Sequence, residues 1–196
     1  TRWIICWLSL ALLVTPSVFG SEMKKAVFAG GCFWCIEAIF QQLKGVLQVT
    51  SGYSGGNVPG VPTYREVSSG RTGHAEVIQV LFDTNCIGYE ELLVIFMTSH
   101  DPTTNNTIET EYGSQYRSVI FYHNNEQEKI AREVLLELKP AFDKTITTEI
   151  VEFIKFFEAE DYHQNYYQNN VEAPYCQAMI TPKLEKFRKR YQEKVK

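Results

Sequence analysis

The sequence predicts an α+β fold, in which a mixed sheet packs against helices. Segments rich in β-branched and aromatic residues alternate irregularly with segments of helical periodicity. The tight hairpin turns that join the strands of an all-β protein are missing. The chain of 196 residues contains no internal repeat and no low-complexity linker, so we expect one folded domain. These patterns leave the order of the strands open.

The first half of the chain predicts three strands and two helices. Apolar residues spaced i, i+3, i+4 and i+7 mark the first helix, and the residue before Pro102 ends the second because it avoids the helical region. In order, we expect a strand at 25–29, a helix whose buried face is Ile36, Ile39, Phe40 and Leu43, a strand at 46–53, a Gly/Pro-rich loop at 52–62, a strand at 74–82 and a helix from 88 to 100.

The second half predicts two more strands and three helices. Asn124 or Asn125 caps the first of these helices, Pro140 ends it, and Pro182 sits in the first turn of the last. In order, we expect a loop at 103–113, a strand at 117–122, a helix up to 140, a strand at 150–156, a polar helix at 160–170 and a final helix from 181.

The first twenty residues predict a secretory signal peptide. Arg2 precedes an apolar run from Trp3 to Val14, and residues 18–20 resemble a cleavage site. The alternative is an uncleaved anchor, but an apolar run of about a dozen residues is short for the ~20 that span a bilayer. We therefore expect a secreted or periplasmic catalytic domain at 21–196 with no stable membrane association after cleavage.

The charge of the chain excludes one class of partner. A net charge of −4 argues against nucleic acid, which binds a basic surface. We expect a monomer that binds no nucleic acid. A basic cluster near the C-terminus is expected on the solvated side of the last helix; it consists of Lys183, Lys186, Arg188, Lys189 and Arg190.

Two thiols follow the first strand, in Gly30-Gly31-Cys32-Phe33-Trp34-Cys35. Cys32 falls in the first turn of the predicted helix, where free N–H groups and the positive end of the helix dipole favour a thiolate. We expect its pKa to lie below the ~8.5 of a free cysteine, which makes it a nucleophile at neutral pH.

Three interpretations of this Cys-x-x-Cys motif compete. A zinc site needs two more ligands at close spacing, but Cys86 and Cys176 stand alone and no histidines pair, so we expect no metal. A redox pair fits the order of strand, turn, motif and helix. Two buried core cysteines are the third interpretation. The bulky Phe33 and Trp34 beside glycines favour the wall of a small apolar ligand pocket.

Glu76 is a candidate acid. The alternation at 74–82 puts its carboxyl group at the end of an apolar row formed by Ile78, Val80 and Phe82. Burial there would raise its pKa and keep it protonated at neutral pH. From the pattern alone, a strand-end glutamate with its carboxylate in water is the commoner outcome.

Gly31-Cys32-Phe33-Trp34 resembles the signature of the peptide methionine sulfoxide reductases of the A type. The resemblance covers nearly everything after Met23 and follows that family's order through 52–56, Tyr64, 73–77, 99–102, 113–118, 162–164 and 174–176. It implies an enzyme without a bound cofactor, in a ferredoxin-like two-layer sandwich with long irregular segments. Its implied substrates are oxidised proteins and free methionine S-sulfoxide.

The resemblance also implies the roles of the site residues. Cys32 attacks the sulfoxide sulfur, and Glu76, helped by Tyr64 and Tyr116, protonates the oxygen. Cys32 becomes a sulfenic acid, a second thiol condenses with it, and an external dithiol such as thioredoxin reduces the disulfide. Phe33 and Trp34 would hold the substrate methyl group.

One position departs from the family pattern. Glu111 takes the place of an aspartate, one methylene shorter, that the family carries before the Gln-Tyr-Arg-Ser segment. Glu111 keeps the charge, so it remains a candidate site residue, but the position of that charge changes.

The second thiol has two candidates. Cys35 lies one helical turn from Cys32, and a disulfide between them needs some unwinding of that turn. Cys176 lies in a tail without glycine that runs into an ordered helix. We expect Cys35 to resolve the sulfenic acid, with Cys176 as the alternative. The rival function is a thioredoxin-like electron carrier or a redox-sensing domain, which the bulky residues between the thiols disfavour.

Overall fold

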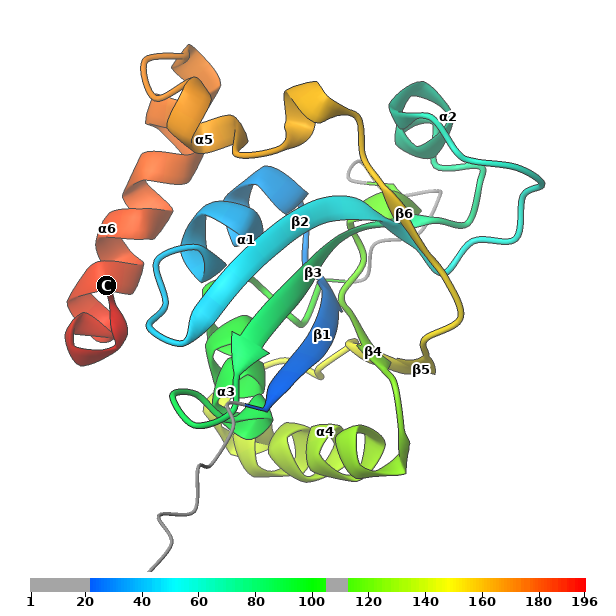
Figure 1. Ribbon diagram of the computed structural model, residues 1–196. Coiled ribbons are helices and arrows are strands. Elements are labelled where there is room, and N and C mark those ends of the chain that lie inside the picture. Colours follow the sequence, from blue (N-terminus) through cyan, green and yellow to red (C-terminus); the bar gives the residue numbers. More distant parts are fainter. Residues whose placement is uncertain (1–21, 105–112) are drawn as a thin grey trace, which may run out of the picture.

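The computed structural model describes residues 22–104 and 113–196, and it confirms the α+β class (Figure 1). The expected signal peptide lies outside these residues. The elements are β1 (Met23–Ala29), α1 (Phe33–Phe40), β2 (Val46–Ser54), α2 (Tyr64–Ser68), β3 (Ala75–Asp83), α3 (Tyr89–Ser99), β4 (Val119–Tyr122), α4 (Asn125–Leu138), β5 (Glu149–Glu152), β6 (Phe156–Glu158), α5 (Tyr166–Asn169) and α6 (Thr181–Arg190). None of the helices in this described part is long and apolar enough to cross a membrane.

Six strands form one sheet in the order β5-β4-β1-β3-β2-β6. Neighbouring strands run antiparallel except β4 and β5, which are parallel. The segment β1-α1-β2-β3-α3-β4 supplies the four central strands, in the order β4-β1-β3-β2. This is the ferredoxin-like β-α-β-β-α-β arrangement, so the expected two-layer sandwich is confirmed.

The two faces of the sheet carry separate apolar clusters. On the helix side, Phe28 of β1 stacks on Phe96 of α3 with ring centroids 4.9 Å apart and lies 5.7 Å from Phe40 of α1. On the other side, a smaller cluster includes Val77 and Phe121. The alternation predicted for β3 is confirmed, because Val77 belongs to the small cluster whereas Ile78, its neighbour, belongs to the large one.

The prediction of one strand at 150–156 is wrong. The segment forms β5 and β6, which lie on opposite edges of the sheet and are joined by three residues, 153–155. Four residue steps reach roughly 14 Å at most, whereas a flat sheet would separate these edge strands by roughly 24 Å. The sheet must therefore curl. Phe153 and Phe156 pack on the small cluster, so it curls around that cluster.

The prediction of one helix at 160–170 is also wrong. The segment is a 3-10 turn (Asp161–His163) followed by the short helix α5, and Asn165 between them has a φ of 53°, in the left-handed region. The last helix begins at Thr181 as expected, but a π-helical turn (Cys176–Ile180) leads into it.

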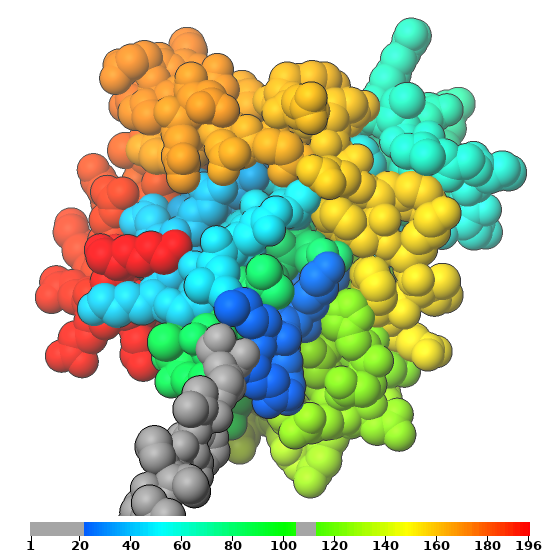
Figure 2. All heavy atoms as spheres, viewed as in Figure 1, coloured from blue at the N-terminus to red at the C-terminus, as the bar shows by residue number. Residues whose placement is uncertain are grey.

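The C-terminal segment packs along the helix that follows the two thiols. In Figure 2 this orange to red segment lies beside the blue and cyan residues that follow β1. Glu37 of α1 holds the contact, because its buried carboxylate accepts the backbone N–H groups of Asn165 (3.0 Å) and Tyr166 (3.2 Å). Burial raises the pKa of Glu37. This contact fixes α5 against α1 and brings the end of the chain to the thiols.

Candidate active site

The turn before α1 is shaped by two glycines. Gly31 has a φ of +75°, which favours glycine, and its N–H donates to the carbonyl oxygen of Tyr116 at 3.2 Å. A Cβ on Gly30 would lie 2.7 Å from the ring of Phe96, so only glycine fits there without a shift. The turn delivers Cys32 to the N-cap position of α1.

Glu76 lies under the start of this helix. Its side chain is 1% exposed, and its Oε2 accepts the backbone N–H of Phe33 at 3.0 Å. Burial raises the pKa of Glu76 to about 8, against the opposing effect of that hydrogen bond. The expected buried and protonated acid is therefore present, in contact with the residue that follows Cys32.

The prediction of a lowered pKa for Cys32 is wrong. A hydrogen bond to Cys35, burial and the nearby Glu76 carboxyl group raise the pKa of the Cys32 thiol. The helix terminus does not reverse this, because the Cys32 side chain makes no capping hydrogen bond and Glu76 takes the Phe33 N–H group. The Cys32 thiol instead donates to the sulfur of Cys35, whose pKa falls to about 6.

Lys183 of α6 is the cation beside this thiolate. Its Nζ lies 3.7 Å from the Sγ of Cys35, and its charge contributes to the lowered pKa of Cys35 after the hydrogen bond from Cys32. Lys183 makes no ion pair within the described residues. The Tyr175 hydroxyl hydrogen-bonds to both sulfurs. Lys183 and Tyr175 thus favour a negative charge at Cys35, the thiol that lies beside the cation.

Aromatic rings surround the acid and the thiols. The ring of Phe33 is fully buried and stacks on the ring of Tyr64 at 6.5 Å, while Trp34 stacks on Tyr166 at 3.7 Å. The charges of Glu76 and Cys32 contribute, after burial, to raising the pKa of both Tyr64 (to about 12) and Tyr116. Both hydroxyls therefore stay protonated and can donate hydrogen bonds.

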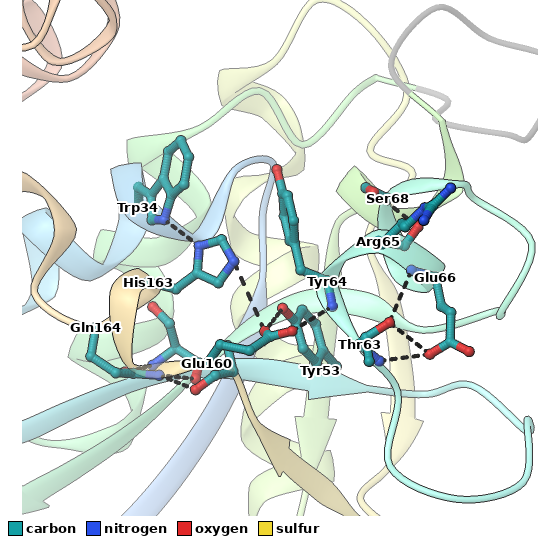
Figure 3. A network of polar contacts seen from close by, with 12 residues as sticks. Trp34, Tyr53, Thr63, Tyr64, Arg65, Glu66, Ser68, Glu160, His163 and Gln164 are labelled. Atoms are coloured by element: carbon teal, nitrogen blue, oxygen red, sulfur yellow. Dashed lines mark hydrogen bonds and ion pairs between the residues drawn. The ribbon is translucent and has the colours of Figure 1, made fainter.

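A set of polar contacts positions Trp34 and Tyr64 (Figure 3). The Trp34 indole N–H donates to Nδ1 of His163 at 3.1 Å, which leaves the proton of a neutral imidazole on Nε2. His163 Nε2 lies 3.9 Å from Oε2 of Glu160. Glu160 also accepts the hydroxyl of Tyr53 and the backbone N–H of Tyr64, each at 2.8 Å. His163 thus holds Trp34, and Glu160 holds the backbone of Tyr64; Nε2 of His163 has no hydrogen-bond partner within the described residues.

The side chains that remain to be placed are Glu111, Cys176 and Cys86. Glu111 lies outside the described residues. Cys176 is fully buried, and the charge of Cys35 adds to burial in raising its pKa, so it lies near Cys35. Cys86 is exposed in the turn after β3, the length of that strand away from Glu76. The described residues contain no group of three or more side chains that could hold a metal ion.

Sequence reasoning assigned no role to several of the residues found here: Tyr175, Lys183, Glu160, His163 and Glu37. Tyr175 and His163 stand within segments that carry the family resemblance, so a signal for them was present. Lys183 and Glu37 had none, because their importance depends on how the C-terminal segment packs on α1.

The comparison with known proteins agrees with this geometry. The family model described as peptide methionine sulfoxide reductase matches residues 24–195. The chain belongs to this family. The peptide methionine sulfoxide reductase MsrA of Saccharolobus solfataricus is 49% identical over 89% of this chain and 98% of its own length. That of Sulfolobus acidocaldarius is 51% identical over 88% and 97%.

Solved structures of methionine sulfoxide reductases have a fold similar to that of this chain. Methionine sulfoxide reductase A of Corynebacterium diphtheriae superposes with a TM-score of 0.71, at 34% identity over 76% of each chain. The reduced form of Mxr1 from Saccharomyces cerevisiae gives a TM-score of 0.71, at 32% identity over 79% of this chain and 90% of its own.

Replacement of Lys183 by methionine should raise the pKa of Cys35. We expect the ultraviolet absorbance of the thiolate in the reduced protein to titrate near pH 6 in the wild type and about one unit higher or more in Lys183→Met. Cys35→Ser should remove the transition. Lys189→Met is the matched control, since Lys189 lies on the same helix outside the cavity at the thiols. Equal midpoints in the wild type and Lys183→Met would contradict the assignment.

Proposed function

We propose that the chain reduces methionine S-sulfoxide, in peptides and as the free amino acid, through its own thiols. The observation that carries the proposal is the buried Glu76, which is hydrogen-bonded to the Phe33 N–H group at the start of the helix that bears Cys32. A sulfoxide oxygen is a poor leaving group until it is protonated. A carboxyl group with a pKa of about 8 holds a proton for that oxygen at neutral pH.

In the first step, Cys32 and Glu76 each give up one proton. Cys32 attacks the sulfoxide sulfur while its own proton passes to the Cys35 thiolate, which already accepts a hydrogen bond from it. Glu76 gives its proton to the oxygen, with Tyr64 and Tyr116 donating hydrogen bonds. The attack forms a bond between the Cys32 sulfur and the substrate sulfur. The hydroxyl group then moves to the Cys32 sulfur: the substrate S–O bond breaks, a new S–O bond forms to Cys32, and the S–S bond breaks as methionine leaves. Phe33 and Trp34 would hold the methyl group, and the hydrogen bond from Trp34 to His163 fixes the orientation of Trp34.

The second step forms a disulfide. Cys35 attacks the sulfur of the Cys32 sulfenic acid, the S–S bond forms, and the hydroxyl group leaves as water with the Cys35 proton. Cys35 is adjacent to Cys32, whereas Cys176 is fully buried in its π-helical turn. Cys176 then supports the site as a buried neighbour of Cys35.

An external dithiol would return the disulfide to two thiols. Mxr1, a relative of similar fold, has been solved in complex with Trx2, and a thioredoxin-like protein is the reductant proposed here. An electron carrier is a poorer account of the site, since Cys35 is 3% exposed and a carrier must present its thiols to partners. We propose that the protein acts in a secreted or periplasmic setting, which rests on the N-terminal sequence pattern alone, and we separately propose that it acts as a monomer.

Single-turnover reduction tests the function and the acid together. The wild type should convert methionine S-sulfoxide to methionine with a simple dithiol, and Cys32→Ser should not. Glu76→Gln should slow methionine formation by ~10²–10⁴-fold, the usual effect of losing a general acid. The wild-type rate should fall as the pH rises through about 8, where Glu76 loses its proton, and Glu76→Gln should lack that fall. Rates for the two proteins within twofold would rule out the acid.

The resolving thiol can be identified by peptide mapping. After one equivalent of methionine S-sulfoxide without a reductant, we expect a bridge between Cys32 and Cys35, because these two sulfurs already share a hydrogen bond. Cys176→Ser serves as the control and should form the same bridge at the same rate. A dominant bridge between Cys32 and Cys176 would overturn the assignment.

A further inference from the structure

A groove runs from the thiols along the last helix. It encloses about 700 Å³ between the C-terminal end of α3 and α6, which lies beside α1 (Figure 1). Cys32 lines one part of it, together with Tyr116 and Tyr175. The size is typical of a ligand site. Free methionine sulfoxide needs only the region at Cys32, so most of the groove is available to other parts of a larger substrate.

One wall of the groove is basic in a protein of net negative charge. Lys183, Lys186 and Arg190 line it, and they stand at i, i+3 and i+7 on one face of α6. All five cations of the predicted basic cluster are exposed, as expected, and this subset also lines the groove. Among the described lining residues Asp101 is the single carboxylate, and its Oδ1 already accepts the N–H (2.9 Å) and hydroxyl (2.6 Å) of Thr103.

None of these three cations has a carboxylate partner within the part of the chain that the structure describes, and Lys183 lies beside Cys35. Within the described residues neither Lys186 nor Arg190 makes an ion pair, and the Arg190 guanidinium instead lies over the Tyr191 ring at 5.5 Å. By contrast, Arg188 on another side of the helix donates to Gln42. Lys186 and Arg190 therefore present positive charge to whatever enters the groove.

The spacing of the cations matches an extended peptide. Lys183 lies beside Cys35, and Lys186 and Arg190 follow it by about 4.5 Å and about 10.5 Å along the helix axis. An extended chain advances about 3.3 Å per residue. In a peptide whose oxidised methionine sits at Cys32, the next one or two residues would thus lie beside Lys186. The residue about three positions from the methionine would lie beside Arg190.

We propose that this groove binds the chain that flanks an oxidised methionine and selects peptides with aspartate or glutamate one to four residues from it. The inference rests on the proposed function and specifies the substrate class. The floor between the walls is apolar, with Ile39, Met179 and Phe187, which suits the aliphatic stems of the same side chains.

The test compares peptides that differ only in charge. Each carries one methionine S-sulfoxide with two glutamates, or two glutamines, placed before or after it. We expect kcat/KM about three- to tenfold higher for the acidic peptide in one of the two placements, the effect of one or two solvent-exposed ion pairs. The preference should shrink at high salt, which screens such pairs.

Charge-removal variants locate the effect. Lys186→Met and Arg190→Met should each reduce the preference about two- to threefold, while Lys189→Met, on the same helix outside the groove, should retain it.

Free methionine S-sulfoxide separates the two proposals: if the wild type does not reduce it, the proposed function fails. If the wild type reduces it but shows no acidic preference in either placement, only the groove proposal fails. Variants that change only the rate with a thioredoxin-like reductant would assign the groove to that protein instead.

Discussion

The site depends on one buried hydrogen bond, from the Phe33 N–H group to the Glu76 carboxyl oxygen. It joins the first turn of α1 to β3 and so holds the thiols above the acid. Because Glu76 is desolvated, it stays protonated at neutral pH, and because it occupies the Phe33 N–H group, that group is not left to stabilise a Cys32 thiolate. Burial of Glu76 thus keeps the acid protonated, and its carboxyl group adds to the raised pKa of Cys32.

A negative charge on the thiol pair is favoured at Cys35, the less exposed of the two residues. Cys35 receives a hydrogen bond from Cys32 and the charge of Lys183, which comes from the last helix. The fold makes this contact possible through Glu37, whose buried carboxylate ties the turn at Asn165 to α1. The C-terminal segment is therefore a functional part of the site, since it supplies the cation, the Tyr175 hydroxyl and the basic wall of the groove.

Much of the site could be predicted from the sequence, and the rest depended on long-range packing. The alternation in β3 placed Glu76 at the end of an apolar row but favoured a solvated carboxylate, and the family resemblance gave it the role of the acid. The helical spacing after the thiols predicted the buried face of α1. The residue types in segment 150–156 did not predict its division into β5 and β6, because both edge strands need the same residue types. The contact between Lys183 and Cys35 spans 148 positions and has no local pattern. The prediction of a lowered pKa for Cys32 was wrong because it took the helix terminus into account but not the neighbouring Cys35 and Glu76.

The protonation state of Glu76 tests this account most directly. Infrared difference spectra between the wild type and Glu76→Gln, recorded in the reduced protein without substrate, report the carbonyl band of a protonated carboxyl group. The account predicts that the band is present at pH 7 and is lost with a midpoint near pH 8. A band that is absent at pH 7, with a midpoint near that of an ordinary glutamate, would contradict the claim that burial keeps this acid neutral.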